Sequence, residues 1–218
     1  KADFGIVVDP DVDRLAFIDE KGVVFGEEYT LVACSDYVLS KKPGNTVSNL
    51  SSTRALSEIT VQKGGTYHAS AVGEVNVVDK MKKVKAVIGG EGNGGIIYPD
   101  LHYGRDALVG VALFLSLLTE KNQKVSVLRA SYPDYAMSKA KISLSKEMDV
   151  DLIFKKVERK FSKNNMITID GVKISFESSW VHLRKSNTEP IIRVYTEAKS
   201  QLEADELAKR FLGEIQEV

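Results

Sequence analysis

The sequence predicts an α/β domain with a mixed, largely parallel sheet, followed by an α+β domain with an antiparallel sheet. From residue 27 to residue 122, apolar stretches of strand length alternate with helical stretches, which is typical of a parallel sheet covered by helices. Beyond a polar link at Lys121–Lys124 this alternation ends, and a helical stripe, a hairpin pattern and a terminal helix follow. We therefore predict three parts, covering residues 1–26, 27–122 and 123–218.

The first part is predicted to be two short strands on either side of an acidic loop. Residues 4–8 form an apolar run that predicts a buried strand, and residues 15–18 predict a second strand. A turn at Glu20–Gly22 leads into another short apolar stretch, residues 23–25. We interpret this part as a sheet edge that is too small to be a domain.

The middle part is predicted to alternate between strands and helices. Strands are expected over residues 46–50, 66–69 and 86–88, and helices over residues 27–40, from Thr53, over 75–81 and over 107–118. Asp106 is expected to cap the last helix, because its carboxylate can accept hydrogen bonds from free backbone amides there. That apolar helix is shorter than the roughly 20 residues needed to cross a bilayer, so it is predicted to lie in the core.

The last part follows a different pattern. Residues 150–163 carry a helical apolar stripe, and residues 166–176 alternate around Asp170-Gly171 like a hairpin. An apolar strand containing Trp180 is expected to end in a polar loop before residues 191–193. The terminal helix opens with Ser200 and Glu203 in capping-box spacing.

Composition excludes some classes of partner. The 30 basic and 30 acidic residues cancel without any block of like charge, so neither nucleic acid nor an anionic membrane surface is favoured. The single cysteine, Cys34, cannot form an internal disulfide and lies in a helical pattern, which favours a buried structural thiol. These features fit a reducing compartment, and we expect a cytoplasmic protein.

Three aspartates, Asp9, Asp11 and Asp13, alternate directly after the first apolar run and are followed by Arg14. Carboxylates this close repel one another, and a hard divalent cation with oxygen ligands, above all Mg²⁺, relieves that repulsion. A calcium EF-hand would need Gly where Arg14 stands. The nucleophile loop of haloacid-dehalogenase-type phosphatases and a solvated acidic turn both stay open as alternatives.

A glycine-rich run over residues 89–95 follows another apolar strand and carries Glu91 and Asn93. Glycines let the backbone approach a ligand closely, and a carboxylate beside an amide suits the paired hydroxyls of a sugar. The glycine spacing differs from the dinucleotide fingerprint, so nicotinamide cofactors are not expected. A plain tight turn is the competing interpretation.

A third polar loop begins at Arg184 and runs through Ser186, Asn187 and Thr188 towards Arg193. Two arginines, two hydroxyls, an amide and backbone N–H groups are suited to a phosphate with several acceptor oxygens. The same residues would also be compatible with a polar hairpin loop.

In this order and with these intervals, the three loops resemble those of the α-D-phosphohexomutase superfamily, which includes phosphoglucomutases, phosphomannomutases and phosphoglucosamine mutases. The resemblance covers essentially the whole chain. DPDVDR resembles the family's metal loop D-G-D-x-D-R, GGEGNGG its sugar loop G-E-x-S-G, and RKSNTEP its phosphate loop. It implies that residues 1–26 are the tail of a second domain, 27–122 a third, sugar-binding domain and 123–218 a fourth, phosphate-binding domain.

The resemblance also implies roles for individual residues. The three aspartates would bind Mg²⁺, and Arg14 would contact the phosphoryl group in transfer. Sugar hydroxyls would be held by Glu91 and Asn93, with help from the segment containing Ser70 and Glu74. The phosphate that does not react would be held by five residues: Arg184, Ser186, Asn187, Thr188 and Arg193. The sequence departs from the family at Pro10, Asn93 and Gly95, and these departures leave the identity of the hexose open.

The activity implied is that of a phosphotransferase-type isomerase. A phosphoserine would convert hexose 1-phosphate to hexose 6-phosphate of glucose, mannose or glucosamine through a hexose 1,6-bisphosphate. No segment of this sequence resembles the T-A-S-H-N-P motif that carries the phosphoserine. We therefore predict that N-terminal domains of the same protein are missing and that these residues alone are inactive. A dehalogenase-type phosphatase and a non-enzymatic sugar-phosphate-binding module remain the alternatives.

Overall fold

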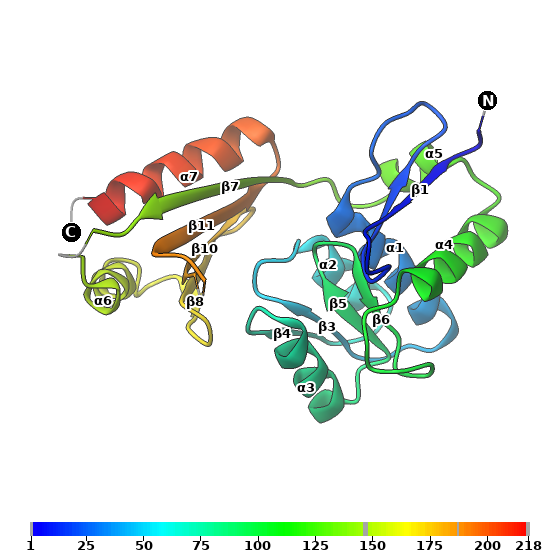
Figure 1. The fold of residues 1–218 in the computed structure, drawn as a ribbon, viewed down its shortest axis with the longest axis horizontal. Coiled ribbons are helices and arrows are strands. Elements are labelled where there is room, and N and C mark those ends of the chain that lie inside the picture. The colour runs from blue at the N-terminus through cyan, green and yellow to red at the C-terminus, as the bar shows by residue number, and fades with distance from the viewer. Residues whose placement is uncertain (1, 146–147, 187, 217–218) are drawn as a thin grey trace. The chain divides into compact units, whose positions relative to one another are not determined.

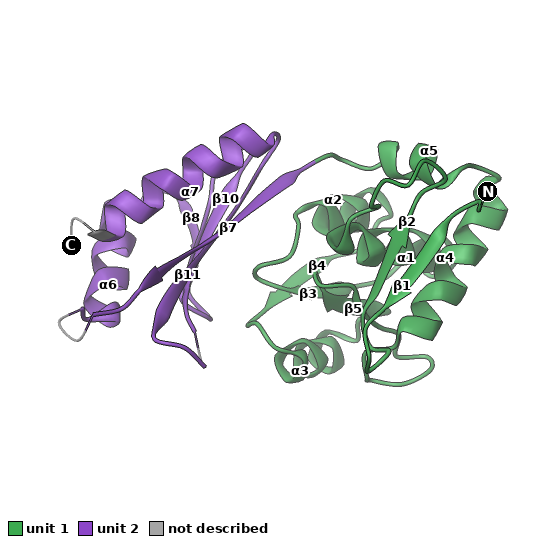
Figure 2. Ribbon diagram, turned by 45° about the horizontal axis from the view of Figure 1, so that its top comes forward, with its two compact units in different colours: residues 1–134 green, residues 135–218 purple. Residues whose placement is uncertain are grey.

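The structure is a computed structural model, and it describes residues 2–145, 148–186 and 188–216. The chain forms two compact units, unit 1 over residues 1–134 and unit 2 over residues 135–218 (Figure 2). The division lies one short helix beyond the predicted boundary at 122/123. That helix was not predicted. It belongs to unit 1, because its side chains contact the first part of that unit.

The short helix α5 (Val125–Ala130) is fixed to the start of unit 1 by polar contacts. The Ser126 hydroxyl and amide donate to the Glu20 carboxylate. Arg129 donates from Nε to the carbonyl of Phe25 at 3.0 Å, and its guanidinium stacks 3.4 Å from the centre of the Tyr29 ring. Together with the buried side chains of Val125 and Leu128, these polar contacts attach α5 to unit 1.

The main sheet of unit 1 is mixed and largely parallel, as the sequence predicts (Figure 1). Its strand order is β4-β3-β5-β6, with β4, β3 and β5 parallel and β6 antiparallel to β5. The strands are β3 (Thr46–Asn49), β4 (Tyr67–Ser70), β5 (Ile88–Glu91) and β6 (Gly95–Ile97). The helices are α1 (Glu27–Lys41), α2 (Ala55–Gln62), α3 (Glu74–Val84) and α4 (Ala107–Lys121).

Helices cover both faces of this sheet. A side chain at Gly89 would meet Met81 of α3, whereas one at the next residue, Gly90, would meet Leu31 of α1. Successive strand residues point to opposite faces, so α3 and α1 lie on opposite sides of β5. The carboxyl ends of the parallel strands thus lead into loops between two helical layers, the usual position of a ligand site in such sheets.

The glycine-rich run is a hairpin rather than a loop that follows a strand. The predicted strand over residues 86–88 is shifted, because β5 extends through Gly89 and Gly90 to Glu91, which pairs with Gly95 at the start of β6. Gly94, with φ of 85°, forms the turn. A Cβ at Gly94 would lie 2.2 Å from the carbonyl oxygen of Leu15, so glycine allows the hairpin to pack against the aspartate loop.

The strand before the aspartate loop is not buried, contrary to prediction. Among the described residues β1 (Gly5–Val8) pairs only with β2 (Leu15–Ile18), and Ile6, Val7 and Val8 are between 41% and 49% exposed. A two-stranded ribbon has no third strand or second layer to cover both faces. The buried face comes from β2, whose Phe17 ring stacks 3.7 Å from Phe114 of α4.

The caps predicted at two helices are confirmed. Asp106 accepts hydrogen bonds from the amides of Leu108 and Val109 at the start of α4. Ser200 accepts from the amide of Glu203 at 3.3 Å and donates to its carboxylate at 3.0 Å before α7 (Gln201–Gln216). In the described residues, no helix is both long enough and apolar enough to span a bilayer.

Unit 2 is an α+β unit with an antiparallel sheet, as predicted. Its strand order is β7-β11-β10-β9-β8. The strands are β7 (Ala136–Ser143), β8 (Asn165–Ile167), β9 (Val172–Ser175), β10 (Trp180–Lys185) and β11 (Ile191–Ala198). β8 and β9 form the predicted hairpin, whereas β7 was not predicted, since seven of its eight residues are partly or fully exposed and it lacks a strong apolar alternation.

The core of unit 2 lies between the sheet and two helices, α6 (Val150–Lys160) and α7. Val181 and Leu183 of β10 and Ile192 and Val194 of β11 pack in one cluster with Phe211 of α7. The residues that alternate with these four on the strands therefore point to the opposite face of the sheet. Arg184 and Arg193 are on that opposite face.

Candidate functional site

The aspartate loop is a tight turn closed by its own backbone. The amide of Val12 donates to the carbonyl of Asp9 at 3.1 Å, and the Asp9 carboxylate accepts from the amides of Asp13 and Arg14 at 3.1 and 3.2 Å. Val12 has a φ of 56°, a conformation that costs energy for a β-branched residue. Within this turn the side chains of Asp9 and Asp13 interact with each other, while Asp11 is exposed.

Charge is unevenly distributed between these two carboxylates. Burial raises the pKa of Asp13 above its usual value, and the neighbouring Asp9 carboxylate adds to the rise against the opposing pull of Arg105. Burial also raises the pKa of Asp9, but the hydrogen bonds from the amides of Arg14 and Asp13 lower it further, so this pKa lies below its usual value. Asp13 is thus the carboxylate that gains most from a nearby positive charge.

The donor set of the loop suits a hard divalent cation. Asp13 Oδ1 is buried and accepts no hydrogen bond within the described chain, and Arg14 Nε lies 3.9 Å from it. Asp9 and Asp13 supply only oxygen ligands, which is the preference of Mg²⁺. In the part of the chain that the structure describes, no group of three or more His, Cys, Asp or Glu side chains is gathered to hold a metal ion.

Arg105, which the sequence prediction missed, connects acidic side chains of the aspartate loop, the start of α3 and the end of β5. Its Nη2 lies 2.5 Å from Asp13 Oδ2, its Nε lies 3.2 Å from Glu74 Oε2, and its Nη1 lies 3.4 Å from Glu91 Oε2. The guanidinium is largely buried, with 16% of the side chain exposed. One signal was available: Arg105 directly precedes the N-cap of α4, where the helix dipole disfavours a positive charge, so another interaction must hold it.

Glu91, predicted to bind sugar hydroxyls, is itself buried in a hydrogen-bond network. Its Oε1 accepts from Asn49 Nδ2 at 3.0 Å and from the amide of Gly73 at 3.2 Å, while Oε2 faces Arg105. Only 6% of Glu91 is exposed. Asn49, which holds this carboxylate in place from the end of β3, belongs to no motif and was not predicted.

Asn93 is partly exposed, and it lies beside the aspartate loop. It accepts a hydrogen bond from the amide of Gly95, and the amide of Leu15 donates to the carbonyl of Gly94 at 3.1 Å. A hollow of about 240 Å³ in unit 1 is lined by eight residues: Val7, Val8, Asp9, Arg14, Leu15, Ala16, Glu27 and Asn93. The structure therefore places a predicted metal ligand, the predicted phosphoryl contact and a predicted sugar contact around one hollow.

The other two predicted sugar residues differ in accessibility. Ser70 is buried at 4% exposure, and its hydroxyl donates to the carbonyl of Ala71. Glu74, the first residue of α3, accepts from the Arg105 amide at 3.2 Å besides pairing with its guanidinium. Glu74 thus joins the group around Arg105, whereas Ser70 does not.

In unit 2 the two predicted phosphate arginines face each other across neighbouring strands. Arg184 of β10 and Arg193 of β11 are direct register partners, so their side chains leave the same face of the sheet. Arg184 Nε is buried without a hydrogen bond in the described chain, and the closest carboxylate oxygen, from Asp170, is 3.8 Å away. Two opposed guanidiniums repel each other, and an anion between them would remove that repulsion.

Hydroxyl groups lie next to these arginines. Ser186 is buried, and its hydroxyl lies 3.5 Å from that of Thr188 and accepts from the Thr188 amide at 3.4 Å. Arg193 contacts Glu189 at 3.1 Å and the Tyr195 hydroxyl at 3.3 Å, and these contacts raise its pKa. Asn187, the remaining predicted phosphate residue, lies outside the described residues.

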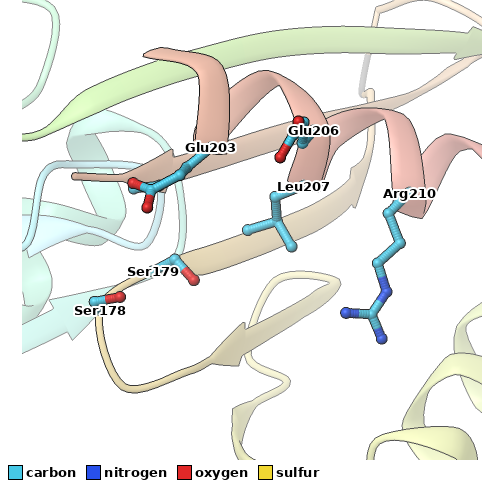
Figure 3. A pocket seen from close by; sticks show the side chains of 7 residues that line it. Ser178, Ser179, Glu203, Glu206, Leu207 and Arg210 are labelled. Atoms are coloured by element: carbon cyan, nitrogen blue, oxygen red, sulfur yellow. The ribbon is translucent and has the colours of Figure 1, made fainter. Parts of the chain in front are cut away.

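A separate hollow in unit 2, of about 310 Å³, lies between α7 and the turn before β10 (Figure 3). Figure 3 shows Glu203, Glu206, Leu207 and Arg210 reaching into it from α7, opposite two serines. None of the predicted site residues lines it. We therefore do not include it in the candidate site.

Comparisons with known proteins agree with the geometry of both units. Residues 26–135 match the family model "Phosphoglucomutase/phosphomannomutase, alpha/beta/alpha domain III", and residues 137–214 match "Phosphoglucomutase/phosphomannomutase, C-terminal domain". Both models describe the phosphoglucomutase/phosphomannomutase family, to which the three loops show their resemblance.

Curated relatives match along nearly the whole chain. A "Phosphoglucomutase/phosphomannomutase" of Thermococcus kodakarensis is 36% identical over 94% of this chain and 45% of its own length. A "Probable phosphoglucosamine mutase" of Methanopyrus kandleri is 32% identical over 97% of this chain and 47% of its own length. The crystal structure of a phosphoglucomutase/phosphomannomutase family protein from Burkholderia thailandensis superimposes with a TM-score of 0.84 at 25% identity, over 99% of this chain and 46% of the other. The chain spans about half the length of the curated relatives it matches.

Proposed function

Because the chain belongs to the phosphoglucomutase/phosphomannomutase family, we propose that it supplies the metal, sugar and phosphate loops of a phosphohexomutase. The reaction proposed for the whole enzyme is the interconversion of hexose 1-phosphate and hexose 6-phosphate, with glucose, mannose or glucosamine as the hexose. The partners proposed are these hexose phosphates, a hexose 1,6-bisphosphate and further domains of the same protein.

One observation carries this proposal. In unit 1, Asp9, Arg14 and Asn93 line a single hollow of about 240 Å³, although two loops far apart in sequence provide them. A hollow that combines carboxylate, guanidinium and amide groups suits a polar, negatively charged ligand bound next to a cation. An acidic turn without a function would not need this combination.

The residues of unit 1 would bind and orient the reacting end of the sugar phosphate. Arg14, half of whose side chain is exposed, can donate two hydrogen bonds to phosphoryl oxygens. Asp9 and Asp13 would hold the divalent cation, with exposed Asp11 completing the set. When bound, the cation would neutralise negative charge on the phosphoryl oxygens during transfer.

The residues of unit 2 would bind the phosphate that does not react. Arg184 and Arg193 supply paired guanidiniums, and Ser186 and Thr188 supply hydroxyl donors. Such a site fixes the orientation of the substrate, and correct orientation contributes much of the rate in phosphoryl transfer. We propose that Asn187 belongs to the same set.

The nucleophile of the reaction is proposed to be a phosphoserine outside these residues, since no T-A-S-H-N-P-like segment occurs in this sequence. The 218-residue chain is then expected to bind sugar phosphates without converting them. A coupled assay that converts glucose 1-phosphate to glucose 6-phosphate tests this expectation, and detectable turnover by the pure chain would contradict it.

Binding can be tested by isothermal titration calorimetry with glucose 6-phosphate, mannose 6-phosphate and glucosamine 6-phosphate. We expect at least one to bind, and Arg193→Gln to weaken that binding about tenfold or more, because a charge-assisted pair of hydrogen bonds is lost. Arg159→Gln, which removes the same charge from an exposed site on α6, is the matched control. Equal losses in both variants would contradict the phosphate site, because only general charge would then matter.

A further inference from the structure

Arg105 occupies a position that the proposed reaction does not by itself explain. It lies just before α4, outside the aspartate loop and outside the glycine-rich hairpin, yet it contacts acidic residues of both. Three carboxylates, those of Asp13, Glu74 and Glu91, share this one guanidinium. Each of them has been assigned above to cation or sugar binding.

The backbone leaves room for this arrangement. A Cβ at Gly95 would lie 2.6 Å from Arg105 Cδ and 3.2 Å from its Cγ, closer than ordinary van der Waals contact. Any residue larger than glycine at position 95 would displace the arginine side chain. The aliphatic part of Arg105 therefore runs over Gly95, and this directs its guanidinium towards Asp13.

The contact with Asp13 has a further consequence for cation binding. Asp13 Oδ2 lies 2.5 Å from Arg105 Nη2, the shortest of the three contacts. A divalent cation bound by Asp13 would bring a second and larger positive charge next to the guanidinium. Because like charges at this separation repel strongly, the cation and the Asp13–Arg105 contact oppose each other.

We infer that Arg105 is a positioning residue that competes with the divalent cation for Asp13 and links the aspartate loop to Glu74 and Glu91. Without the cation, Arg105 neutralises Asp13. With the cation bound, the guanidinium shifts its interaction to Glu74 and Glu91, the carboxylates beside the sugar loops. This inference rests on the proposed function, because it takes the aspartate loop as the cation site.

The first test measures the affinity of the 218-residue chain for Mn²⁺, a paramagnetic probe that also takes oxygen ligands, by electron paramagnetic resonance. Arg105→Gln removes the competing charge, so the Kd for Mn²⁺ is expected to fall about tenfold, and the further change Asp13→Asn should abolish that gain. Gly95→Ala, which displaces the arginine and also brings a Cβ 3.3 Å from Asn93 Oδ1, should lower the Kd in the same direction by a smaller factor. Arg159→Gln controls for net charge and should leave the Kd unchanged.

The outcomes separate this inference from the proposed function. A folded Arg105→Gln or Gly95→Ala chain whose Kd is unchanged or higher would overturn the competition, while the cation site itself would stand. If neither the natural chain nor Arg105→Gln bound Mn²⁺, both the cation site and the inference built on it would be wrong.

A second measurement follows Arg105 in the natural chain and uses a variant only to assign its resonance. In ¹⁵N–¹H spectra of the natural chain, the arginine Nε–H resonance that disappears in Arg105→Lys identifies Arg105. Titration with Mg²⁺ should shift this resonance, because the guanidinium changes partners, and should leave that of Arg129 on α5 in place. An Arg105 resonance that does not move while Mg²⁺ binds would overturn the inference.

Discussion

The two units hold their candidate binding residues in opposite electrostatic states. In unit 1, three carboxylates converge on the guanidinium of Arg105, which can balance the charge of only one of them. In unit 2, Arg184 and Arg193 face each other across two strands, and Arg184 Nε has no hydrogen bond in the described chain. Unit 1 therefore gathers an excess of negative charge around one guanidinium. In unit 2 two guanidiniums face each other, with Asp170 3.8 Å from Arg184 and Glu189 3.1 Å from Arg193.

This difference predicts how ligand binding would change the electrostatic interactions of each unit. In unit 1 a cation must displace Arg105 from Asp13, so binding there depends on competition between the two positive charges. A site with opposed like charges becomes more stable when an anion arrives, since the ligand removes a repulsion. The same type of side chain, arginine, should thus have opposite effects on stability in the two units.

The largest expected effect is the loss of stability in unit 1 when Arg105 is replaced by methionine. Removing one partner from a largely buried ion-pair group leaves uncompensated carboxylates, and we expect a loss of about 4 kcal/mol. Hydrogen exchange measured by mass spectrometry on unit 1 peptides would report it. The only tryptophan, Trp180, lies in unit 2, so its fluorescence transition in urea provides an internal control and should not change. An equal loss of stability in both units would contradict the role of Arg105 as an ion-pair partner within unit 1.

The next effect belongs to unit 2 and depends on pH. Burial lowers the pKa of His182 from 6.5 to about 4, although its contact with the Asp170 carbonyl opposes the change. Between pH 6.5 and about 4, His182 is therefore protonated in the unfolded chain but neutral in the folded unit. The stability contribution is complete above pH 6.5 and is lost as pH falls through about 4, by ~3 kcal/mol in all at ~1.4 kcal/mol per pH unit.

Urea unfolding followed by Trp180 fluorescence between pH 7 and pH 4 measures this loss. His182→Gln, which cannot take up a proton, is the matched variant, because it leaves the carboxylates of the unit in place. We expect the natural chain to lose more stability than His182→Gln over this range. Parallel curves for the two chains would show that His182 does not titrate in this way.

At Arg184 we expect a smaller effect, in which one substitution raises the stability of unit 2 and lowers its affinity for phosphate. Replacement by methionine removes a buried guanidinium that repels Arg193, so the stability of unit 2 should rise by about 1 kcal/mol. The same change should weaken glucose 6-phosphate binding about tenfold or more. Arg184→Lys keeps the charge but not the bidentate geometry, and it should weaken binding to an intermediate degree. If Arg184→Met lowered stability instead, the arginine would serve the fold rather than a ligand.

Local patterns predicted most of the fold because the residues that set it act over short distances. The alternating strands and helices of unit 1, the β8–β9 hairpin and the caps at Asp106 and Ser200 follow from neighbouring residues and are present. The burial of β1 was predicted wrongly, since an apolar strand is buried only where other layers cover it. α5 was missed because six residues are too few for a clear helical pattern, although Val125 and Leu128 are buried and polar contacts reach Glu20 and Phe25.

The candidate site was predictable only in part. Asp9, Arg14 and Asn93 were identified from motifs, and the structure places them around one hollow. Arg105 and Asn49 were not identified, because each is a single polar residue whose partner is distant in sequence. Glu91 shows the converse limit: it was singled out from its motif, but its burial among three donors depends on the tertiary structure.

The smallest effect is expected in the aspartate loop, which combines a functional constraint with backbone strain. Val12 has a φ of 56°, and a β-branched residue pays more for this conformation than glycine does. Val12→Gly should therefore stabilise unit 1 by about 0.5 kcal/mol, because relief of strain is partly offset by the larger entropy of the unfolded chain. The same change should weaken Mn²⁺ binding, since Asp9 and Asp13 would no longer be held towards each other. Val12→Ala, which keeps a Cβ at a positive φ, is the matched control and should give little of either effect. If Val12→Gly bound Mn²⁺ more tightly than the natural chain, the strain at Val12 would not serve to orient the two aspartates.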